Sequence, residues 1–398
     1  MRENTDILVS GGGIAGLTAA AAFGAAGFQV ICVDPDPPVT QEDAAGSDLR
    51  STAFLQPSIA VLRTAGLWDR LLPFAAPLQI MRIIDAGGPV AEPRIVKDFN
   101  AAEISDQPFG WNLPNWLLRR EISARLAGMP NVSFRPGTSA TALFTRETEA
   151  LVTLSDGNTV AARMVAAADG RNSTMRAALG IPVKTLRYGQ KALAFAVTHP
   201  IPHGNVSTEI HRSGGPFTLV PLPDREGKPA SAVVWMETGP EVARLAALPA
   251  GDFGAALNAR SCGILGPLTV VSRLTTWPII AQIAERLAGQ RTALLAEAAH
   301  VVPPIGAQGL NMSLADLAAL LKLATARPDD VGSAAMLDAY HRARHRDVRM
   351  RVTGIDALNR ASMMGAQGLR DLRAGVLDTL YSIAPLRRTL MRAGLGLR

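Results

Sequence analysis

The sequence of 398 residues predicts an α/β protein with more than one domain. Three observations support this fold class. Residues 6–34 read in the order strand, glycine turn, helix, strand. Between about residues 183 and 276, short runs of alternating apolar and polar residues are interrupted by Gly and Pro, as in a β-sheet domain. Residues 353–398 mix large apolar residues with arginines in a pattern compatible with amphipathic basic helices.

The composition indicates a globular chain, because 48% of the residues are hydrophobic and only 19% are charged. The two cysteines, Cys32 and Cys262, exclude a disulfide framework and a thiolate-rich zinc site, and they fit a reducing cytoplasm. The net charge of +6 lies entirely in residues 346–398, which hold ten arginines and four aspartates. Such a tail is most simply a solvated helical face; an anionic membrane surface or an acidic partner is the alternative. Aromatic residues are only 5%, without a nucleic-acid-binding motif, so we expect no nucleic acid.

The N-terminal unit carries a fingerprint for a dinucleotide. Gly11, Gly13 and Gly16 form G-x-G-x-x-G between a short apolar strand and an Ala-rich helix. The first glycine allows a sharp turn, the second allows backbone to approach a pyrophosphate, and the third allows helix and strand to pack closely. Unpaired N–H groups at the helix start, including those of Ile14 and Ala15, would then face the phosphates. Asp34 ends the second strand and can accept hydrogen bonds from an adenosine ribose, which favours FAD or NAD over NADP.

The uncharged stretch from residue 7 to residue 33 has the length of a membrane span, but three consecutive glycines would break such a helix. The acidic residues Glu3 and Asp6 also offset Arg2, so a signal peptide is not expected. We therefore expect a cytoplasmic protein, with peripheral contact at the inner membrane as the alternative.

Two later motifs identify the class of dinucleotide. Residues 165–173, VAAADGRNS, lead from a small-residue strand into an Asp-Gly turn, and residues 291–316, RTALLAEAAHVVPPIGAQGLNMSLAD, lead from a strand through a Pro/Gly loop into a helix. With the N-terminal fingerprint, these motifs resemble the p-hydroxybenzoate hydroxylase superfamily of class A FAD-dependent aromatic monooxygenases. Within it, residues 48–53, 112–120 and 385–388 look like the ubiquinone-biosynthesis hydroxylases, and this resemblance spans nearly the whole chain.

The resemblance implies a domain arrangement and a cofactor site. A Rossmann-like FAD-binding domain would comprise residues 1–77, 100–182 and 277–345; a discontinuous β-sheet substrate domain, residues 78–99 and 183–276; and C-terminal basic helices, residues 346–398. The expected FAD-binding residues are Gly11, Gly13, Ile14, Ala15, Gly16, Asp34, Arg50, Arg119 (or its neighbour Arg120), Asp169, Glu297, Gly309, Leu310 and Asn311. One departure is Ala296-Glu297 in place of the family's Gly-Asp, which brings the affinity for FAD into question.

The resemblance also implies the reaction. A polyprenylated phenol of ubiquinone synthesis would gain a ring hydroxyl from O2 through a flavin C4a-hydroperoxide, with NAD(P)H as a transient reductant, since no second G-x-G-x-x-G follows a strand. A small soluble aromatic substrate and a non-catalytic carrier of prenylated quinone precursors are the alternatives. His300, Pro303 and Gly306 are the catalytic candidates, although a histidine there is more often a structural hydrogen bonder. The candidate substrate-lining residues are Phe217, Leu219, Pro221 and Trp235.

Two further expectations concern metals and partners. His341 and His345 have the spacing of a helical metal pair, but neighbouring arginines oppose divalent metal binding, so we expect no metal. The basic C-terminus is the expected contact for a membrane surface or a ubiquinone-biosynthesis complex. The ring position hydroxylated, the tail length and the choice between NADH and NADPH are left open by the sequence.

Overall fold

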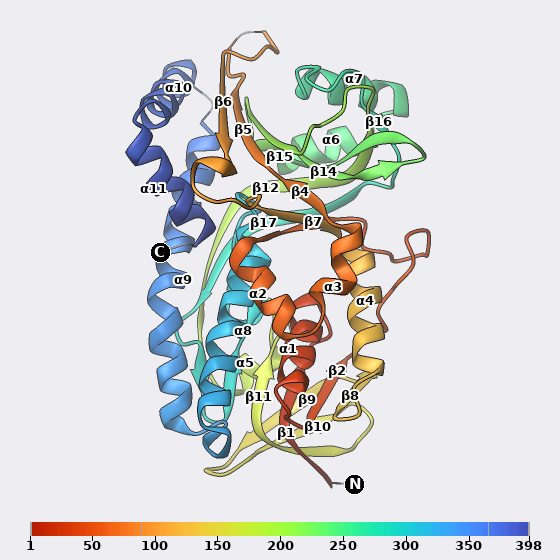
Figure 1. The fold of residues 1–398 in the computed structure, drawn as a ribbon, viewed down its shortest axis with the longest axis vertical. Coiled ribbons are helices and arrows are strands. Elements are labelled where there is room, and N and C mark those ends of the chain that lie inside the picture. The colour runs from red at the N-terminus through yellow and green to blue at the C-terminus, as the bar shows by residue number, and fades with distance from the viewer. Residues whose placement is uncertain (1, 89, 365, 397–398) are drawn as a thin grey trace.

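The computed structural model describes residues 2–88, 90–364 and 366–396, so residues 1, 89, 365 and 397–398 of the predicted segments lie outside it. Within the described ranges the strands form three sheets. Figure 1 shows one sheet in the lower half of the molecule and another in the upper half, with long helices along one edge. The predicted α/β class is confirmed.

The first sheet contains the N-terminal fingerprint. Its strands run in the order β18 (Ala288–Gly289), β19 (Thr292–Leu294), β11 (Thr159–Ala167), β1 (Arg2–Ser10), β2 (Val30–Asp34) and β8 (Val132–Pro136). The strands from β19 to β8 are parallel, and β9 (Ala140–Thr145) and β10 (Ala150–Leu154) extend β11 as an antiparallel branch. Because both faces of a parallel sheet are covered, residues 7–9 of β1 and 30–33 of β2 are apolar and buried on both sides.

Helices cover this sheet closely. Helix α1 (Ile14–Ala25) is apolar all round, and Ala19–Ala22 have no exposed surface. It packs against β1, β2, α4 (Asn115–Ala127) and α8 (Gln308–Ala326). An alanine-rich helix suits this position, since small side chains let it approach the strands from several sides. The uncharged stretch at residues 7–33 is therefore strand, helix and strand, and no helix in the described ranges has the length and apolar character needed to cross a bilayer.

The second sheet comes from two separated parts of the chain. Its order is β20 (His300–Val301), β17 (Thr275–Ala284), β12 (Val183–Thr198), β15 (Lys228–Thr238), β14 (Pro216–Arg225), β13 (Val206–His211), β5 (Ile80–Asp85) and β6 (Ile95–Asn100). The short β16 (Thr269–Val270) also pairs with β12. Helices α6 (Gly239–Ala246) and α7 (Ala250–Arg260) lie on its outer face (Figure 1). The sheet thus has an outer face packed on helices and an inner face turned toward the first sheet.

A small third sheet connects the two larger ones. It has the order β3 (Ser51–Leu55), β7 (Gly110–Pro114) and β4 (Ala76–Leu78) and is accompanied by α2 (Gln56–Thr64), α3 (Trp68–Leu71) and the 3-10 turns η1 (Leu72–Phe74) and η2 (Ala101–Glu103). Strands β4 and β7 both contact β14 of the second sheet. Residues 48–55 are thereby held between the two large sheets.

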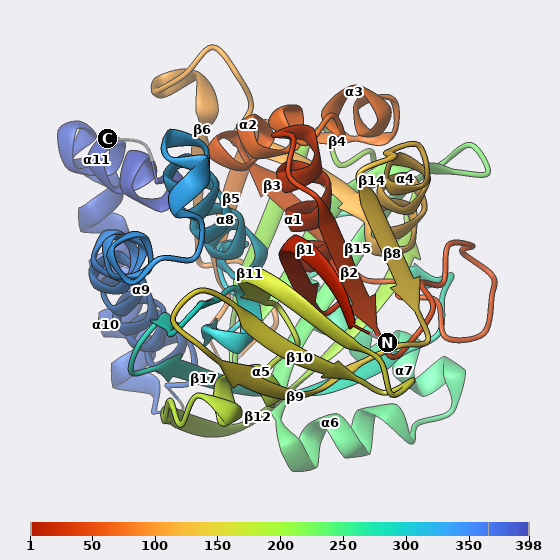
Figure 2. The ribbon, with the colours of Figure 1, turned by 90° about the horizontal axis from the view of Figure 1, so that it is seen from below.

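The C-terminal part is helical. Helix α9 (Ala334–Ser362) runs beside α8, and α10 (Gln367–Ser382) and α11 (Ala384–Leu395) follow it near the upper sheet (Figures 1 and 2). The boundary expected at residue 346 lies inside α9, which continues through it. Helix α11 is attached to the body by Arg387, which forms an ion pair with Glu103 at 2.7 Å, and by the buried side chains of Met391 and Leu395.

Candidate active site

A cavity of about 800 Å³ lies between the first sheet and the inner face of the second. The carboxyl ends of β1, β2 and β11 form one wall, and the loop between β20 and α8 forms another. Ligands of open α/β sheets bind at the carboxyl ends of parallel strands. Fourteen predicted site residues line it: Gly11, Gly13, Ile14, Ala15, Gly16, Asp34, Arg50, Arg119, Asp169, Glu297, His300, Gly306, Gly309 and Leu310.

The glycine turn between β1 and α1 leaves no room for side chains at two of its positions. A Cβ atom on Gly16 would lie 1.9 Å from the carbonyl oxygen of Gly11, and one on Gly11, whose φ is +107°, would lie 2.3 Å from the carbonyl oxygen of Ala168. A Cβ on Gly13 would meet nothing within 4 Å. Gly13 also precedes α1 without a side-chain cap. The positive end of α1 is therefore open to the cavity.

Two aspartates lie at the carboxyl ends of β2 and β11, the strands on either side of β1. Asp34 accepts hydrogen bonds from the backbone N–H of Gly12 and, at 2.9 Å, from that of Asp36. Asp169 accepts from the Ser173 hydroxyl at 2.5 Å and from the Met175 N–H at 3.1 Å. Both carboxylates are thus held in fixed orientations, and each oxygen has a further lone pair for a ligand hydroxyl.

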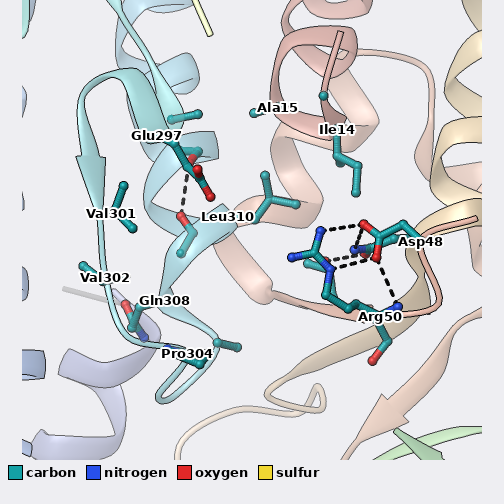
Figure 3. A pocket seen from close by; sticks show the side chains of 18 of the residues that line it. Ile14, Ala15, Asp48, Arg50, Glu297, Val301, Val302, Pro304, Gln308 and Leu310 are labelled. Carbon is teal, nitrogen blue, oxygen red and sulfur yellow. Dashed lines mark hydrogen bonds and ion pairs between the residues drawn. The ribbon is translucent and has the colours of Figure 1, made fainter. Parts of the chain in front are cut away.

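Arg50 and Asp48 form a paired charge on the wall opposite Glu297 (Figure 3). The Arg50 Nε and Nη2 atoms donate to the two Asp48 oxygens, each at 2.7 Å, and Asn115 donates to Asp48 at 3.0 Å. Burial alone would raise the pKa of Asp48, but hydrogen bonds and the charge from Arg50 outweigh it and lower that pKa. The Arg50 guanidinium also lies 5.3 Å from the centre of the Trp277 ring. The geometry fits a cation fixed beside a planar ligand.

The segment that departs from the family pattern adopts an unusual backbone. Ala296 has a φ of +54°, in the left-handed region that favours glycine, and opens the 3-10 turn η3 (Ala296–Ala298). The Glu297 side chain is 57% exposed, and its Oε2 lies 3.9 Å from the Nε of Arg171. The carboxylate therefore reaches the cavity, and no residue in the described ranges forms a close hydrogen bond with it.

His300 belongs to a buried hydrogen-bonded chain with Asp316 and Arg344. Its Nε2 lies 2.6 Å from Asp316 Oδ2, and the other Asp316 oxygen accepts from Arg344 Nε at 2.7 Å. The side chains of His300 and Asp316 are 1% and 0% exposed. Burial would lower the pKa of Arg344, but the charge and hydrogen bond of Asp316 outweigh it and raise that pKa. Asp316 thus orients a histidine that lines the cavity.

Two predicted site residues at the loop before α8 do not line the cavity, namely Pro303 and Asn311. Gly306 and Ala307 have φ values of +61° and +56°, so the chain turns sharply there, and Gly306, Gly309 and Leu310 line the cavity. Pro303 is buried and does not line it. The Asn311 side chain also points elsewhere, because its oxygen accepts from Leu55 N–H and its amide donates to the Ala53 carbonyl. Asn311 therefore fastens α8 to β3.

Comparisons with known proteins agree with this geometry. The family model described as "FAD binding domain" matches residues 4–354. "Ubiquinone hydroxylase UbiL" of Rhodospirillum rubrum is 34% identical over 394 residues, which cover 98% of this chain and 89% of that protein. The chain belongs to the FAD-dependent ubiquinone-biosynthesis hydroxylases. It is therefore an FAD-dependent aromatic monooxygenase, and its cofactor is FAD.

Two further proteins are similar to this chain over almost its full length. The "3-demethoxyubiquinol 3-hydroxylase" of Escherichia coli K12 is 24% identical over 399 residues, covering 99% of each chain. The crystal structure of p-nitrophenol 4-monooxygenase PnpA from Pseudomonas putida DLL-E4 covers 100% of this chain and 99% of its own, with a TM-score of 0.80 and 20% identity. The second likeness shows that the fold is shared.

The residues present fit FAD. Gly13 leaves open space at the positive end of α1, where a pyrophosphate would be held, and Asp34 is placed for a ribose hydroxyl. Arg119 lines the cavity, and its buried Nε has no hydrogen-bond partner among the described residues, as is expected of a side chain that completes its bonds with a bound group. When bound, reduced flavin is the group that would react with O2. The protein's part is to hold the flavin, exclude water and orient the ring of the substrate.

The inner face of the second sheet is lined by residues that the sequence analysis did not select. Phe217, Leu219 and Trp235 are buried in a second core beneath α6 and α7. Pro221 is also buried and does not line the cavity. Its carbonyl oxygen accepts a hydrogen bond from the Asn112 side chain. Their alternate neighbours Thr218, Val220 and Val234 line the cavity instead. Both faces of these strands are covered, so the apolar pattern does not distinguish the cavity face from the core face.

Proposed function

We propose that this hydroxylase adds a hydroxyl group to the aromatic ring of a polyprenylated phenol in ubiquinone synthesis. One oxygen atom of O2 enters the ring, the other becomes water, and NAD(P)H supplies the two electrons. The observation that supports the proposal is the cavity itself, in which a dinucleotide cradle and an apolar sheet face meet. The relative that is 34% identical carries the name of a ubiquinone hydroxylase.

Within this proposal His300 is a positioning or proton-handling residue at the ring. If Asp316 accepts the proton on His300 Nε2, the neutral imidazole presents Nδ1 as an acceptor, which suits a phenolic proton. A purely structural role predicts that His300→Gln leaves the pH profile of turnover unchanged. A role in proton transfer predicts that kcat falls and the profile changes while FAD remains bound.

The function is tested by mass spectrometry of quinone intermediates in cells that lack the gene. We expect a prenylated phenol lacking one ring hydroxyl to accumulate, and the purified FAD-loaded enzyme to convert it with consumption of NAD(P)H and O2. Rapid turnover of tail-less phenols with no prenylated intermediate accumulating would support the small-aromatic alternative. Binding without faster NAD(P)H oxidation would support the carrier alternative.

The exposed face of the C-terminal helices supports a further part of the proposal, a contact with an anionic membrane. Leu372, Val376 and Leu390 are exposed there, and Arg388 and Arg392 add positive charge. Arg387 does not contribute freely, because it pairs with Glu103 and stacks on Tyr381. Deleting α11 would also remove core contacts, so point variants are the sharper test. Leu372→Ser/Val376→Ser should reduce flotation with phosphatidylglycerol vesicles, and unchanged flotation would refute this contact.

A further inference from the structure

A second, smaller cavity of about 230 Å³ opens beside the main one. The two cavities share Leu49, which lies in the segment between β2 and β3. The smaller cavity is bounded by α4, η1, the end of the β14–β15 hairpin and residues 271–272. The smaller cavity is therefore adjacent to the main one at Leu49.

The register of the second sheet shows that one face continues from the main cavity into the smaller one. Three neighbouring strands place their inward side chains in rows, and the first row is Ala194, Val234 and Thr218. The second row is Ala196, Ala232 and Val220, and the third contains Ala230 and Leu222. Most of the first two rows line the main cavity; Ala196, Ala230 and Leu222 line the smaller cavity. The distance from Thr218 to Leu222 is about 13 Å along the strand.

The side chains on this path leave room for a thin apolar molecule. Four of the eight positions in the rows are alanine, so short side chains cover most of this sheet face, and Leu222 lies at its outer end. Trp116 and Phe74 form the opposite wall, with the Arg120 guanidinium 5.4 Å from the centre of each ring. Four charged residues also line the cavity, namely Glu42, Arg120, Asp224 and Arg225, and Arg225 pairs with Glu42 at 2.8 Å. A narrow apolar passage with a polar rim suits a hydrocarbon chain attached to a ring.

We propose that the smaller cavity holds the isoprenoid tail of the substrate while its ring lies against Thr218 and Val220. This inference rests on the proposed function, because it assigns the tail of a prenylated phenol to a place. The two cavities are adjacent at Leu49 and share one sheet face, so we assign the smaller one to a part of the same molecule whose ring is in the main cavity. Leu222, Phe74 and Trp116 then contribute to specificity for tailed substrates.

The smaller cavity is lined by residues of η1 and α4. Helix α4 lies on the opposite side of the molecule from α10 and α11 (Figure 1). Leu72 and Phe74, both in η1, are 48% and 40% exposed beside it. A tail that leaves by this route reaches the surface at η1, whereas a tail directed to the C-terminal helices would contact Leu372 or Val376. The two routes can therefore be told apart by where the tail is found.

Kinetics with a series of phenols carrying zero to three isoprene units provide the first test. The Leu222→Trp variant fills the outer end of the smaller cavity. For this variant we expect the ratio of kcat/KM for the longest substrate to kcat/KM for the tail-less phenol to fall about tenfold. This is the effect of withdrawing roughly two CH2 groups from burial. The control is Leu186→Trp on β12, an exposed position that lines neither cavity, and it should keep the wild-type ratio. A wild-type ratio in Leu222→Trp with FAD bound would overturn the proposal.

Photo-crosslinking provides a readout that does not depend on turnover. A phenol with a diazirine on its second isoprene unit should label Leu222, Phe74 or Trp116, as mapped by mass spectrometry of peptides. Labelling of α10 or α11 would overturn the proposal. If the wild-type enzyme hydroxylates no phenol, with or without a tail, the proposed function fails, and the crosslinking map still decides whether a tail binds in this cavity.

Discussion

Asp316 is the residue whose removal tests the buried charge network most directly. It has no exposed surface and accepts from His300 at 2.6 Å and from Arg344 at 2.7 Å. Arg344 also pairs with Asp347 at 2.8 Å, and its Nη2 is buried without a hydrogen-bond partner among the described residues. Replacing Asp316 by Leu leaves the guanidinium with Asp347 alone.

The expected loss follows from the cost of an uncompensated buried charge. Breaking a buried ion pair from one side costs about 3–5 kcal/mol of the free energy of unfolding, whereas replacing both partners by apolar residues of similar volume is often close to neutral. We therefore expect Asp316→Leu and Arg344→Met each to lose about 3 kcal/mol or more. The double variant should lose clearly less than the sum, because neither charge is then left alone.

Urea denaturation of the FAD-loaded protein, followed by circular dichroism and flavin fluorescence, measures these losses. A cycle with wild type, both single variants and the double variant isolates the coupling between the two side chains. Additive losses would refute the reasoning, since they would show that Asp316 and Arg344 contribute independently. A loss below about 1 kcal/mol in Asp316→Leu would equally show that the charge of Arg344 is already satisfied elsewhere.

Three other predictions concern the cofactor cradle. Gly16→Ala should lose about 3 kcal/mol or more of the free energy of unfolding, because its Cβ would clash with the Gly11 carbonyl. In Gly13→Ala the new Cβ enters open space in the cavity. This variant should therefore unfold at the wild-type urea concentration, yet bind FAD more weakly in a fluorescence titration. Ala296→Gly should raise the melting temperature slightly, since about 1–2 kcal/mol of left-handed strain is relieved and partly offset by chain entropy; an unchanged or lower value would contradict this. The pKa of Asp48 is lowered from its usual 3.8, so its pair with Arg50 stabilises the fold above about pH 3.8. This stabilisation is lost as the pH falls through the lowered pKa. The urea midpoint of Arg50→Met should therefore depend less on pH between about 5 and 3 than that of wild type.

The parts of the site that follow from local backbone requirements could be predicted from the sequence. Gly11, Gly16 and Asp34 occupy the predicted places because a tight turn and a strand end impose them whatever the rest of the chain does. The inner and outer faces of β14 could not be predicted in the same way. Phe217 and Thr218 are adjacent in the sequence, and only the docking of α6 and α7 decides which one reaches the cavity. Asn311 likewise bonds to β3, more than 250 positions away, which no local pattern reveals.

The change from the family's Gly-Asp to Ala296-Glu297 has a second consequence besides the one expected. The sequence predicts that the alanine methyl narrows the approach of the cofactor, and Ala296 does line the cavity. Its backbone also adopts a left-handed conformation that glycine adopts readily, so the substitution raises the free energy of the turn as well. Glu297 remains 57% exposed on the cavity side, with the Nε of Arg171 3.9 Å from its Oε2 and Arg50 on the facing wall close enough to interact with it electrostatically. The longer carboxylate therefore lies between two cations at the cavity, so the change bears on FAD binding as well as on the stability of the turn.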